Sequence, residues 1–489
     1  MTLPPPSHPN SPETLESVAA RGDGSCGQGA IRSLLTHPYT AITIIVLFAM
    51  GIGAALKKSS EWNEVPLGAA KMLLEGRDIY KEMSAYTYPP FTAWVTIPFT
   101  LLPGTAARTV WYVICAGSLV YTVRKSWQLA GGPRLEPIGS PDAARSRDHW
   151  AFLLGHAVAL QLALNGVTHL QSDTLIAALL MAGCGAMASG KYFRSATWIG
   201  IATAFKATPL LFAPYLLWRR QWLAAAWLVC VAIGANLLPN TVHAPPAGGT
   251  WLGEWSRQYL APMGDSNYMP GDWKNQLVNN QALAGAAKRW LATTWEAGPG
   301  EFKVYDRPGK ASPATIRRVF IASCLAVTLP VAIVFWRRRS KDRIVVGESV
   351  GGSEKGFTAS DARRETLEGS LPSPMMIECG IVMLLMLLLS PNSSRAHYCI
   401  LFLPAFCVAR LAVRKPAGWV NILLWLAVIF STLSIHIRLP GTMAAEQVLL
   451  WIGVVMIATI FLLAASTIAL ACRFGSAERS RRREGTLGA

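Results

Sequence analysis

The sequence predicts an all-α integral membrane protein, a polytopic helical bundle with roughly ten to twelve transmembrane helices. Of its 489 residues, 52% are hydrophobic and only 15% are charged, whereas soluble domains carry about 25% charged residues. A helix needs about 20 mostly apolar residues to cross the hydrocarbon core, and apolar runs near this length recur along the chain. They are Tyr39–Leu56, Thr109–Val123, Trp150–Leu164, Thr174–Ala188, Ala196–Trp218, Leu223–Leu238, Val319–Trp336, Met375–Ser390, Cys399–Val413, Val420–Ile435 and Val448–Ala471.

Basic residues lie at the ends of these runs, and they account for most of the net charge of +17. Such clusters follow the runs that end near Trp218, Trp336, Val413 and Ala471. This distribution is the positive-inside pattern of cytoplasmic loops, and no soluble basic domain is present that would bind a nucleic acid. We therefore expect a multi-pass protein of the cell membrane, plasma or inner, with both termini in the cytoplasm and no nucleic-acid partner.

The same reasoning divides the chain into three parts. Residues 1–36 are rich in Pro, Ser and Gly and lack an apolar stretch, so we expect a disordered cytoplasmic tail and a first run that is retained as an anchor. Residues 37–474 should form the membrane domain, with a first outer loop at 57–87, a long outer loop at 239–316 and a cytoplasmic loop at 337–374. Residues 475–489 should form a basic cytoplasmic tail.

One short run, Phe91–Leu102, leaves the topology of the front half open. If it crosses the bilayer, the basic residues at 124–147 fall outside. If it is re-entrant, they move inside, and Ala196–Trp218 must form a hairpin with Lys206 near its apex. Prolines on both sides of the short run favour the re-entrant version, because irregular backbone at membrane depth is tolerated where it lines a cavity.

Polar residues in otherwise apolar surroundings are the first candidates for a functional site, because they are costly within a membrane. His169, Gln171 and Asp173 share one short turn between two apolar runs. Lys206 stands alone in its run, where it either contacts an anion such as a phosphate or snorkels to the interface. Arg395 and His397 lie in a turn between two later runs, which would not need these side chains as a simple connection.

The long outer loop is unusually rich in aromatic and amide side chains. Such a mixture suits a sugar, whose apolar ring faces stack on aromatic rings while its hydroxyl groups bond to amides, although an interfacial aromatic belt has the same composition. The aromatic residues are Trp251, Trp255, Tyr259, Tyr268, Trp273, Trp290 and Trp295.

Four stretches together resemble a known family. They are Gly76–Tyr80 followed by Tyr86–Pro90, which contains Tyr88; Asn165–Asp173; Trp198–Pro209, which contains Lys206; and Ser390–Pro391 with His397. In order and spacing the chain resembles the GT-C glycosyltransferases that use a polyprenyl-phosphate sugar, and within them glycosyltransferase family 87, an α-1,2-mannosyltransferase-like group. The stretch Asn280–Arg289 also resembles an outer-loop element of that family.

The resemblance implies an inverting hexosyltransferase, most simply a mannosyltransferase, on the outer (periplasmic) face of the membrane. Its partners would be a polyprenyl-phosphate sugar donor, a lipid-linked or glycan acceptor and the lipid bilayer. Lys206, Arg395 and His397 would stabilise the leaving phosphate, and His169, Gln171, Asp173, Tyr88 and Asn280 would complete the substrate site. A lipid donor is consistent with a sequence that has no nucleotide-binding motif, and we expect no cofactor and no metal site.

The sequence departs from the family at the expected catalytic base. Family members place an aspartate directly after the first membrane helix, whereas this chain has Glu61 and Glu64 there and no aspartate before Asp78. The spacing favours Glu64 as the base and Glu61 as the second candidate, although Glu64 also suits the capping of the following helix. Two alternatives stay open: a lipid or solute transporter or flippase, which would predict two matched halves, and a catalytically inactive GT-C scaffold.

Overall fold

The computed structural model describes residues 38–57, 59–133, 143–265, 268–271, 278–298, 301–348, 371–414, 418–434 and 443–487. The tail expected at residues 1–36 lies outside this part of the chain. By internal contacts the chain divides into two units, and the smaller one comprises Met1–Met50 and Glu136–Pro141. Its described part is the first thirteen residues of helix α3 (Pro38–Leu56), an apolar helix. Everything below concerns the larger unit, which holds the other described residues.

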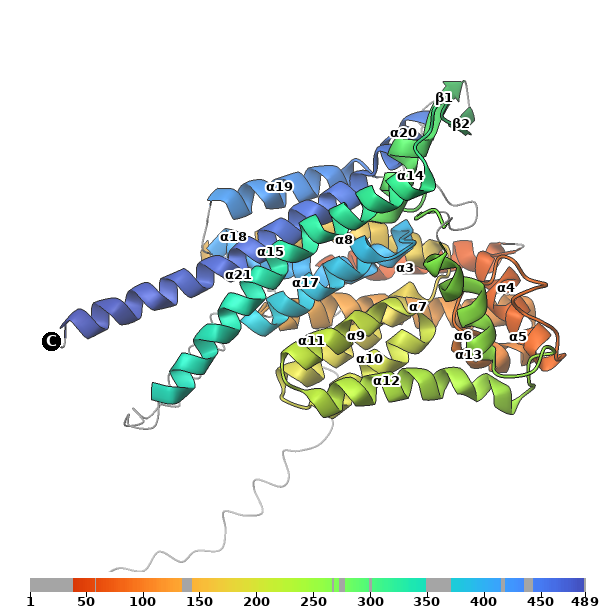
Figure 1. Ribbon diagram of the computed structural model, residues 1–489, viewed down its shortest axis with the longest axis horizontal. Helices are drawn as coiled ribbons and strands as arrows, with labels where there is room; N and C mark the ends of the chain where they lie inside the picture. Colours follow the sequence, from red (N-terminus) through yellow and green to blue (C-terminus); the bar gives the residue numbers. More distant parts are fainter. Residues whose placement is uncertain are drawn as a thin grey trace, which may run out of the picture. The chain divides into compact units, whose positions relative to one another are not determined.

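The larger unit is built almost wholly from helices (Figure 1). Six described helical segments are long and apolar enough to cross a membrane, or seven if one bent pair at residues 42–74 forms a single span. They belong to α7 (Gly104–Leu129), α8 (Ala143–Thr168), α12 (Trp222–Leu237) with η4 (Leu238–Thr241), α15 (Pro313–Glu348), η8 (Arg395–Leu401) with α18 (Phe402–Arg414), and α21 (Val454–Leu487). The predicted all-α polytopic membrane fold is therefore confirmed.

Shorter apolar helices pack among these spans. They include α9 (Asp173–Ala188), α17 (Pro374–Leu389) and α19 (Gly418–Thr432), with 15 or 16 residues each. The expected ten to twelve crossings require such helices to count as spans, so this number stays a prediction. The expected loop at 337–374 and the expected tail at 475–489 are partly helical, since α15 continues to Glu348 and α21 continues to Leu487.

The centre of the bundle is formed by α17 and α18. Almost every residue of α17 is buried, and 89% of the span that contains α18 is buried, compared with 6% for α15. A helix that is apolar on all sides belongs in the interior of a bundle or against lipid. Burial thus separates two groups of helices with similar composition: α17 and α18 contact other helices, and α15 presents most of its surface outward.

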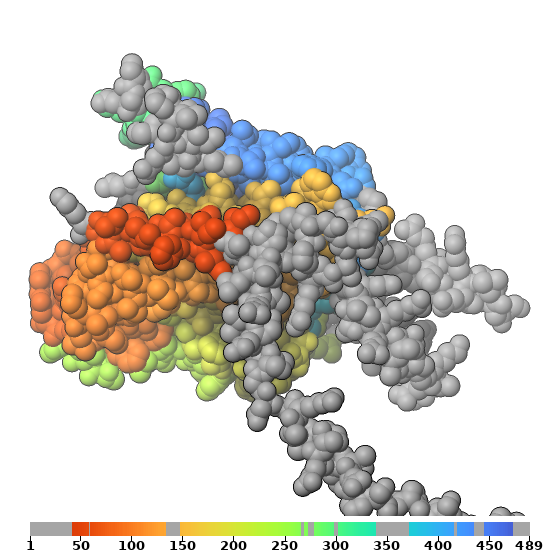
Figure 2. Space-filling model, turned by 180° about the vertical axis from the view of Figure 1, so that it is seen from behind, coloured from red at the N-terminus to blue at the C-terminus, as the bar shows by residue number. Residues whose placement is uncertain are grey.

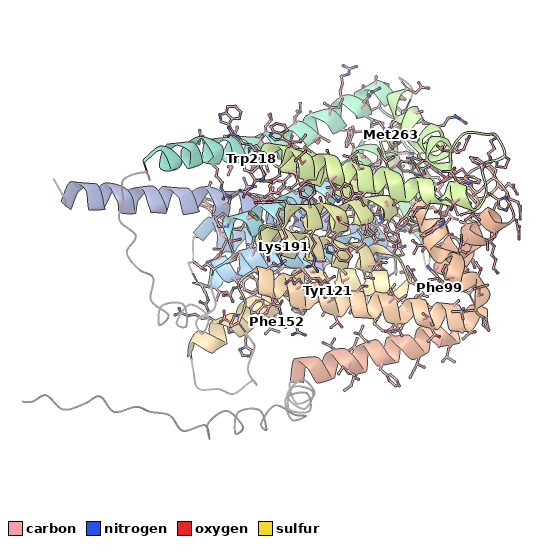
Figure 3. All side chains as sticks on the ribbon, turned by 90° about the horizontal axis from the view of Figure 1, so that it is seen from below. Phe99, Tyr121, Phe152, Lys191, Trp218 and Met263 are labelled. Atoms are coloured by element: carbon pink, nitrogen blue, oxygen red, sulfur yellow. The ribbon has the colours of Figure 1, made fainter. Side chains whose placement is uncertain are left out.

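The run that contains Lys206 folds back on itself. Helix α10 (Tyr192–Phe205) ends at Lys206, whose backbone is extended, and η3 (Thr208–Leu211) with α11 (Phe212–Trp218) follows. Lys191 and Trp218, which flank this stretch, lie toward the same end of the bundle (Figure 3). Lys206 is therefore at the apex of a hairpin, as the re-entrant version of the topology requires.

The ambiguous short run is also compatible with that version. Helix α6 (Phe91–Thr96) and the 3-10 turn η2 (Ile97–Leu101) together contain 11 residues. At about 1.5 Å per residue this stretch covers roughly half of the hydrocarbon core. It is too short to span the bilayer as a single helix.

The expected outer loops are compact and largely helical. The first contains α4 (Glu61–Glu64) and α5 (Pro66–Leu74). The second contains α13 (Trp251–Trp255), the π-helical turn η5 (Ser256–Leu260), η6 (Ala261–Gly264), α14 (Leu283–Ala292) and a hairpin of β1 (Thr293–Gly298) and β2 (Glu301–Asp306). The strands are antiparallel, with Thr293 opposite Asp306. Helix α20 (Met443–Ile452) packs near this hairpin.

Most aromatic residues at the start of the long outer loop have a structural role. Trp251, Trp255 and Tyr259 are buried in one cluster with Tyr80 and Tyr86 of the first loop. Their polar atoms bond to backbone carbonyl groups; for example, the Tyr259 hydroxyl donates to the carbonyl of Tyr86 at 2.7 Å. These rings hold the two outer loops together, so they are not available for stacking on a sugar.

Candidate active site

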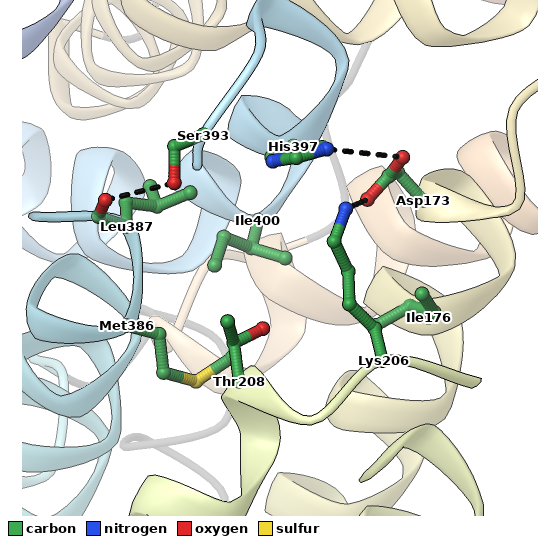
Figure 4. Close-up of a pocket in the computed structure, with 9 residues that line it drawn as sticks. All are labelled: Asp173, Ile176, Lys206, Thr208, Met386, Leu387, Ser393, His397 and Ile400. Atoms are coloured by element: carbon green, nitrogen blue, oxygen red, sulfur yellow. Dashed lines mark hydrogen bonds and ion pairs between the residues drawn. The ribbon is translucent and has the colours of Figure 1, made fainter. Parts of the chain in front are cut away.

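Several polar residues that the sequence singled out converge at one end of the bundle, where three connections between helices meet. Asp173 begins α9 directly after the turn from α8, Lys206 lies between α10 and η3, and His397 lies in η8. Figure 4 shows the three side chains around a cavity that is also lined by Thr208 and Ser393, with apolar residues from α9, α17 and η8. The cavity volume is about 20 Å³, which is room for about one water molecule.

Lys206 forms an ion pair with Asp173. Its Nζ lies 2.8 Å from Oδ1 of Asp173, and the two side chains are only 17% and 4% exposed. The second carboxylate oxygen, Oδ2, is buried and accepts no hydrogen bond from the described residues. A buried carboxylate oxygen without a donor is costly, so this atom is a point at which a ligand or a moving side chain would find an acceptor.

His397 lies on the other side of Asp173. Its Nε2 is 3.9 Å from Oδ2 of Asp173, which is beyond hydrogen-bonding distance. Its Nδ1 accepts a hydrogen bond from the backbone N–H of Ser394 at 3.1 Å. A neutral imidazole with Nδ1 as acceptor carries its proton on Nε2, so His397 presents a donor to the same region as Lys206.

Gln171 connects this cluster to the first outer loop. Its Nε2 lies 3.2 and 3.4 Å from the two carboxylate oxygens of Glu61. Tyr88 is close to the same groups: burial raises the pKa of its hydroxyl well above its usual range, and the charges of Asp173 and Glu61 raise this pKa further. His169 is exposed on the same turn. Glu61, Gln171 and Tyr88 thus extend the site from Asp173 toward the surface.

The two candidate bases have different surroundings. Glu61 contacts Gln171, whereas Glu64 accepts a hydrogen bond from the hydroxyl of Ser59, within its own loop. Both are exposed and both belong to the short helix α4. The sequence placed Glu64 first because of its spacing, but Glu61 is the residue that faces the cluster of polar side chains.

Two other expected substrate-binding residues have structural partners. Arg395 donates to Glu446 of α20 at 2.5 Å and does not line the cavity. The Asn280 side chain is buried, with Nδ2 donating to the carbonyl of Pro391 at 2.9 Å and Oδ1 accepting from the backbone N–H of Ser393 at 3.1 Å. Asn280 therefore positions the turn that carries His397.

Sequence reasoning missed several neighbours of the site. Thr208 and Ser393 line the cavity; Thr208 belongs to the stretch Trp198–Pro209, and Ser393 lies between Ser390–Pro391 and His397. Lys57, directly after the first apolar run, donates to the carbonyl of Thr168 at 2.9 Å. In the sequence, its position as a cation after the first expected helix was the only feature that pointed to it. Among the described residues, no group of three or more His, Cys, Asp or Glu side chains is arranged to hold a metal ion.

Comparison with known proteins identifies the family of the chain. Residues 86–352 match glycosyltransferase family 87. A curated protein of Mycobacterium tuberculosis (strain CDC 1551 / Oshkosh), polyprenol-phosphate-mannose-dependent alpha-(1-2)-phosphatidylinositol pentamannoside mannosyltransferase, is 30% identical over 256 residues. The alignment covers 52% of this chain and 48% of that relative, so the chain spans about half the relative's length. No solved structure matches the chain significantly.

The matched residues include Tyr88, Asp173, Lys206 and Asn280, whereas Glu61 lies before them, and the turn that carries His397 lies after them. The structure brings these separate segments together in one unit. Because the family match covers more than half of the chain, the protein belongs to glycosyltransferase family 87, and its long apolar helices make it a multi-pass membrane protein.

Proposed function

We propose that this protein transfers mannose from a polyprenyl-phosphate donor to a hydroxyl group of a lipid-linked or glycan acceptor on the outer face of the membrane. The observation that carries the proposal is the convergence of Lys206, Asp173 and His397 at one end of the bundle, next to Gln171 and Glu61. The relative's name supports both the polyprenol-phosphate-mannose donor and an acceptor of the phosphatidylinositol mannoside class.

The donor phosphate would bind at Lys206 and His397. The Lys206 ammonium group and the Nε2–H of His397 are two donors on either side of Asp173, and donors of this kind stabilise the charge that develops on a leaving phosphate. Because Asp173 already neutralises Lys206, the phosphate must share or displace this ion pair. The cavity is also much smaller than a sugar, so donor binding requires the hairpin at Lys206 or the turn before His397 to move.

Glu61 is the proposed general base. In an inverting transfer, the base takes the proton of the acceptor hydroxyl while the acceptor oxygen attacks the anomeric carbon. The bond from the anomeric carbon to the phosphate oxygen breaks, and polyprenyl phosphate leaves. Glu61 suits this role because its carboxylate is exposed to an incoming acceptor and lies against Gln171, two residues from Asp173.

The basic residues at the other end of the bundle support the outer location. Arg219, Arg338 and Arg414 lie at the ends of their helices that are remote from Lys206 and His397, and such residues mark the cytoplasmic side. An active site at the opposite end would face the periplasm, where a lipid-linked sugar is the available activated donor.

Glu61→Gln tests the proposal, with Glu64→Gln as its matched control in the same short helix. Membrane vesicles that contain each variant would be given polyprenyl-phosphate [³H]mannose and phosphatidylinositol mannosides, and product formation would be measured. A general base typically contributes about 10²–10⁴-fold in rate, so Glu61→Gln should lower turnover by about this factor at equal expression, and Glu64→Gln should not. The reverse result would make Glu64 the base. Normal transfer by both variants would refute this mechanism.

A further inference from the structure

An apolar groove lies at the end of the bundle remote from the candidate active site. It is formed by α8, α18 and α19, and its walls include Trp150, Leu154, Val413, Leu424 and Trp425. Helices α8 and α19 contact one another, and Figure 2 shows the gold and blue surfaces of these segments side by side. The groove encloses about 280 Å³, close to the lower end of the range for ligand pockets in proteins.

The position of the groove relative to the active site follows from two spans. The spans Arg147–Thr168 and Arg395–Arg414 contain 22 and 20 residues, so each is about 30 Å long. Thr168 and Arg395 are at the active-site end, whereas Trp150 and Val413 are near the other end. The groove therefore opens in the opposite leaflet and cannot be a second part of the transferase site.

A charge cluster borders the groove. Asp148 lies 2.7 Å from Nη1 of Arg410 and 2.8 Å from Nη2 of Arg414. Arg410 is fully buried and also lies over the ring of Trp127, whereas the side chain of Arg414 is 23% exposed. Within this cluster one carboxylate faces two guanidinium groups, and Arg147 beside it is exposed. Arg147 and Arg414 are close in sequence to the lining residues Trp150 and Val413, so among the described residues at this end of the groove the guanidinium groups outnumber the carboxylates.

An apolar slot with a cationic entrance suits one class of ligand, an anionic lipid. Guanidinium groups donate charge-assisted hydrogen bonds to phosphate oxygens, and basic residues at the cytoplasmic end of a span attract anionic headgroups. Arg414 already donates to Asp148 through Nε at 3.3 Å and Nη2 at 2.8 Å, so a phosphate would share this guanidinium group with Asp148. Trp150 and Trp425 are largely exposed on the walls of the slot, and their amphipathic rings suit the level of the headgroups. The half-buried Asn421 adds a polar side chain to the lining.

We propose that this groove binds one anionic glycerophospholipid of the leaflet opposite the candidate active site, with an acyl chain between Trp150 and Trp425 and the phosphate at Arg414. This inference goes beyond the proposed transferase activity and does not depend on it. Such a lipid would join α8, α18 and α19 at their common end, where Asp148 already connects α8 to α18.

Native mass spectrometry of the purified full chain tests this site with two probes, phosphatidylglycerol and phosphatidylcholine. The wild type should retain one phosphatidylglycerol more tightly than it retains phosphatidylcholine. Hydrogen bonds to charged groups contribute enough for Arg414→Gln to weaken retention about tenfold or more. This variant leaves the pair between Asp148 and Arg410 intact, so the protein should still fold.

Two further variants separate specific binding from general charge and from misfolding. Arg124→Gln also removes one positive charge, from an exposed position near the C-terminal end of α7, where Trp127 contacts Arg410. This variant should retain the lipid. Val413→Trp fills the groove without a change in charge and should release it. Equal retention of both lipids by the wild type, or unchanged retention of phosphatidylglycerol by Arg414→Gln and Val413→Trp, would overturn the proposal.

Discussion

Replacement of Lys206 by methionine should lower both stability and activity, and the structure separates the two effects. Lys206 Nζ is 2.8 Å from a carboxylate whose side chain is 4% exposed. At an effective dielectric constant of about 20, two unit charges at this distance interact by about 6 kcal/mol, an upper limit. Loss of one partner of a buried pair typically costs about 3–5 kcal/mol, because the other charge is left buried and unpaired. Lys206→Met should therefore be destabilised by about this amount.

The double variant Asp173→Asn/Lys206→Met distinguishes the ion pair from phosphate binding. It removes both charges, so stability should recover, and the two substitutions should show a coupling energy of about 2–3 kcal/mol in a double-mutant cycle. Mannose transfer should stay low in the double variant, because the cation for the phosphate is still missing. The assays are unfolding in mixed micelles and transfer from polyprenyl-phosphate mannose in vesicles.

Two outcomes would contradict this reasoning. Additive effects of the two substitutions on stability would mean that Lys206 and Asp173 do not interact in the native protein. Full transfer by a stable double variant would mean that Lys206 contacts no phosphate, and its extended conformation would then serve only to reach the membrane interface.

Three further predictions concern the scaffold and the topology. Asn280→Ala should lower the free energy of unfolding by about 2–4 kcal/mol, since the buried amide holds the turn before His397 by hydrogen bonds of about 1 kcal/mol or more each; an unchanged value would contradict this bracing role. Glu378→Gln should also destabilise the protein by about 3 kcal/mol, because this fully buried carboxylate accepts hydrogen bonds from two arginines and a tyrosine. A stability equal to that of the wild type would show that these hydrogen bonds do not depend on the charge of Glu378. In a background without accessible native cysteines, Glu296→Cys in β1 should react with an impermeant thiol reagent from outside, whereas Arg124→Cys should react only after permeabilisation; the opposite pattern would reverse the proposed orientation.

The sequence predicted the membrane class and most helices because these properties are local. A run of about 20 apolar residues forms a helix in lipid whatever its neighbours are, since every backbone polar group must be satisfied within the segment. The run expected at Thr174–Ala188 corresponds to α9, and the run at Met375–Ser390 corresponds to α17. Lys206 and Asp173 were also found from sequence alone, because a charge in an apolar context is conspicuous.

The roles of the candidate residues required the tertiary structure. The spacing in the sequence favoured Glu64 over Glu61, and only a contact with Gln171, 110 residues away in sequence, favours Glu61 instead. Asn280 resembled a substrate-binding residue, but its amide is used to hold a turn more than 100 residues away. The direction of a side chain depends on how its helix is rotated against its neighbours, and local sequence does not specify this rotation.

By itself, therefore, the sequence determined that the chain lies in a membrane, which segments are apolar enough to form its helices, and which polar residues are unusual there. Only the tertiary structure decided that Lys206 pairs with Asp173, that the aromatic rings of Trp251 and Tyr259 are internal, and that an apolar groove meets a basic cluster at Arg414. The physical reason is that hydrophobicity acts on each segment separately, whereas ion pairs, buried rings and grooves exist only between segments that packing brings together.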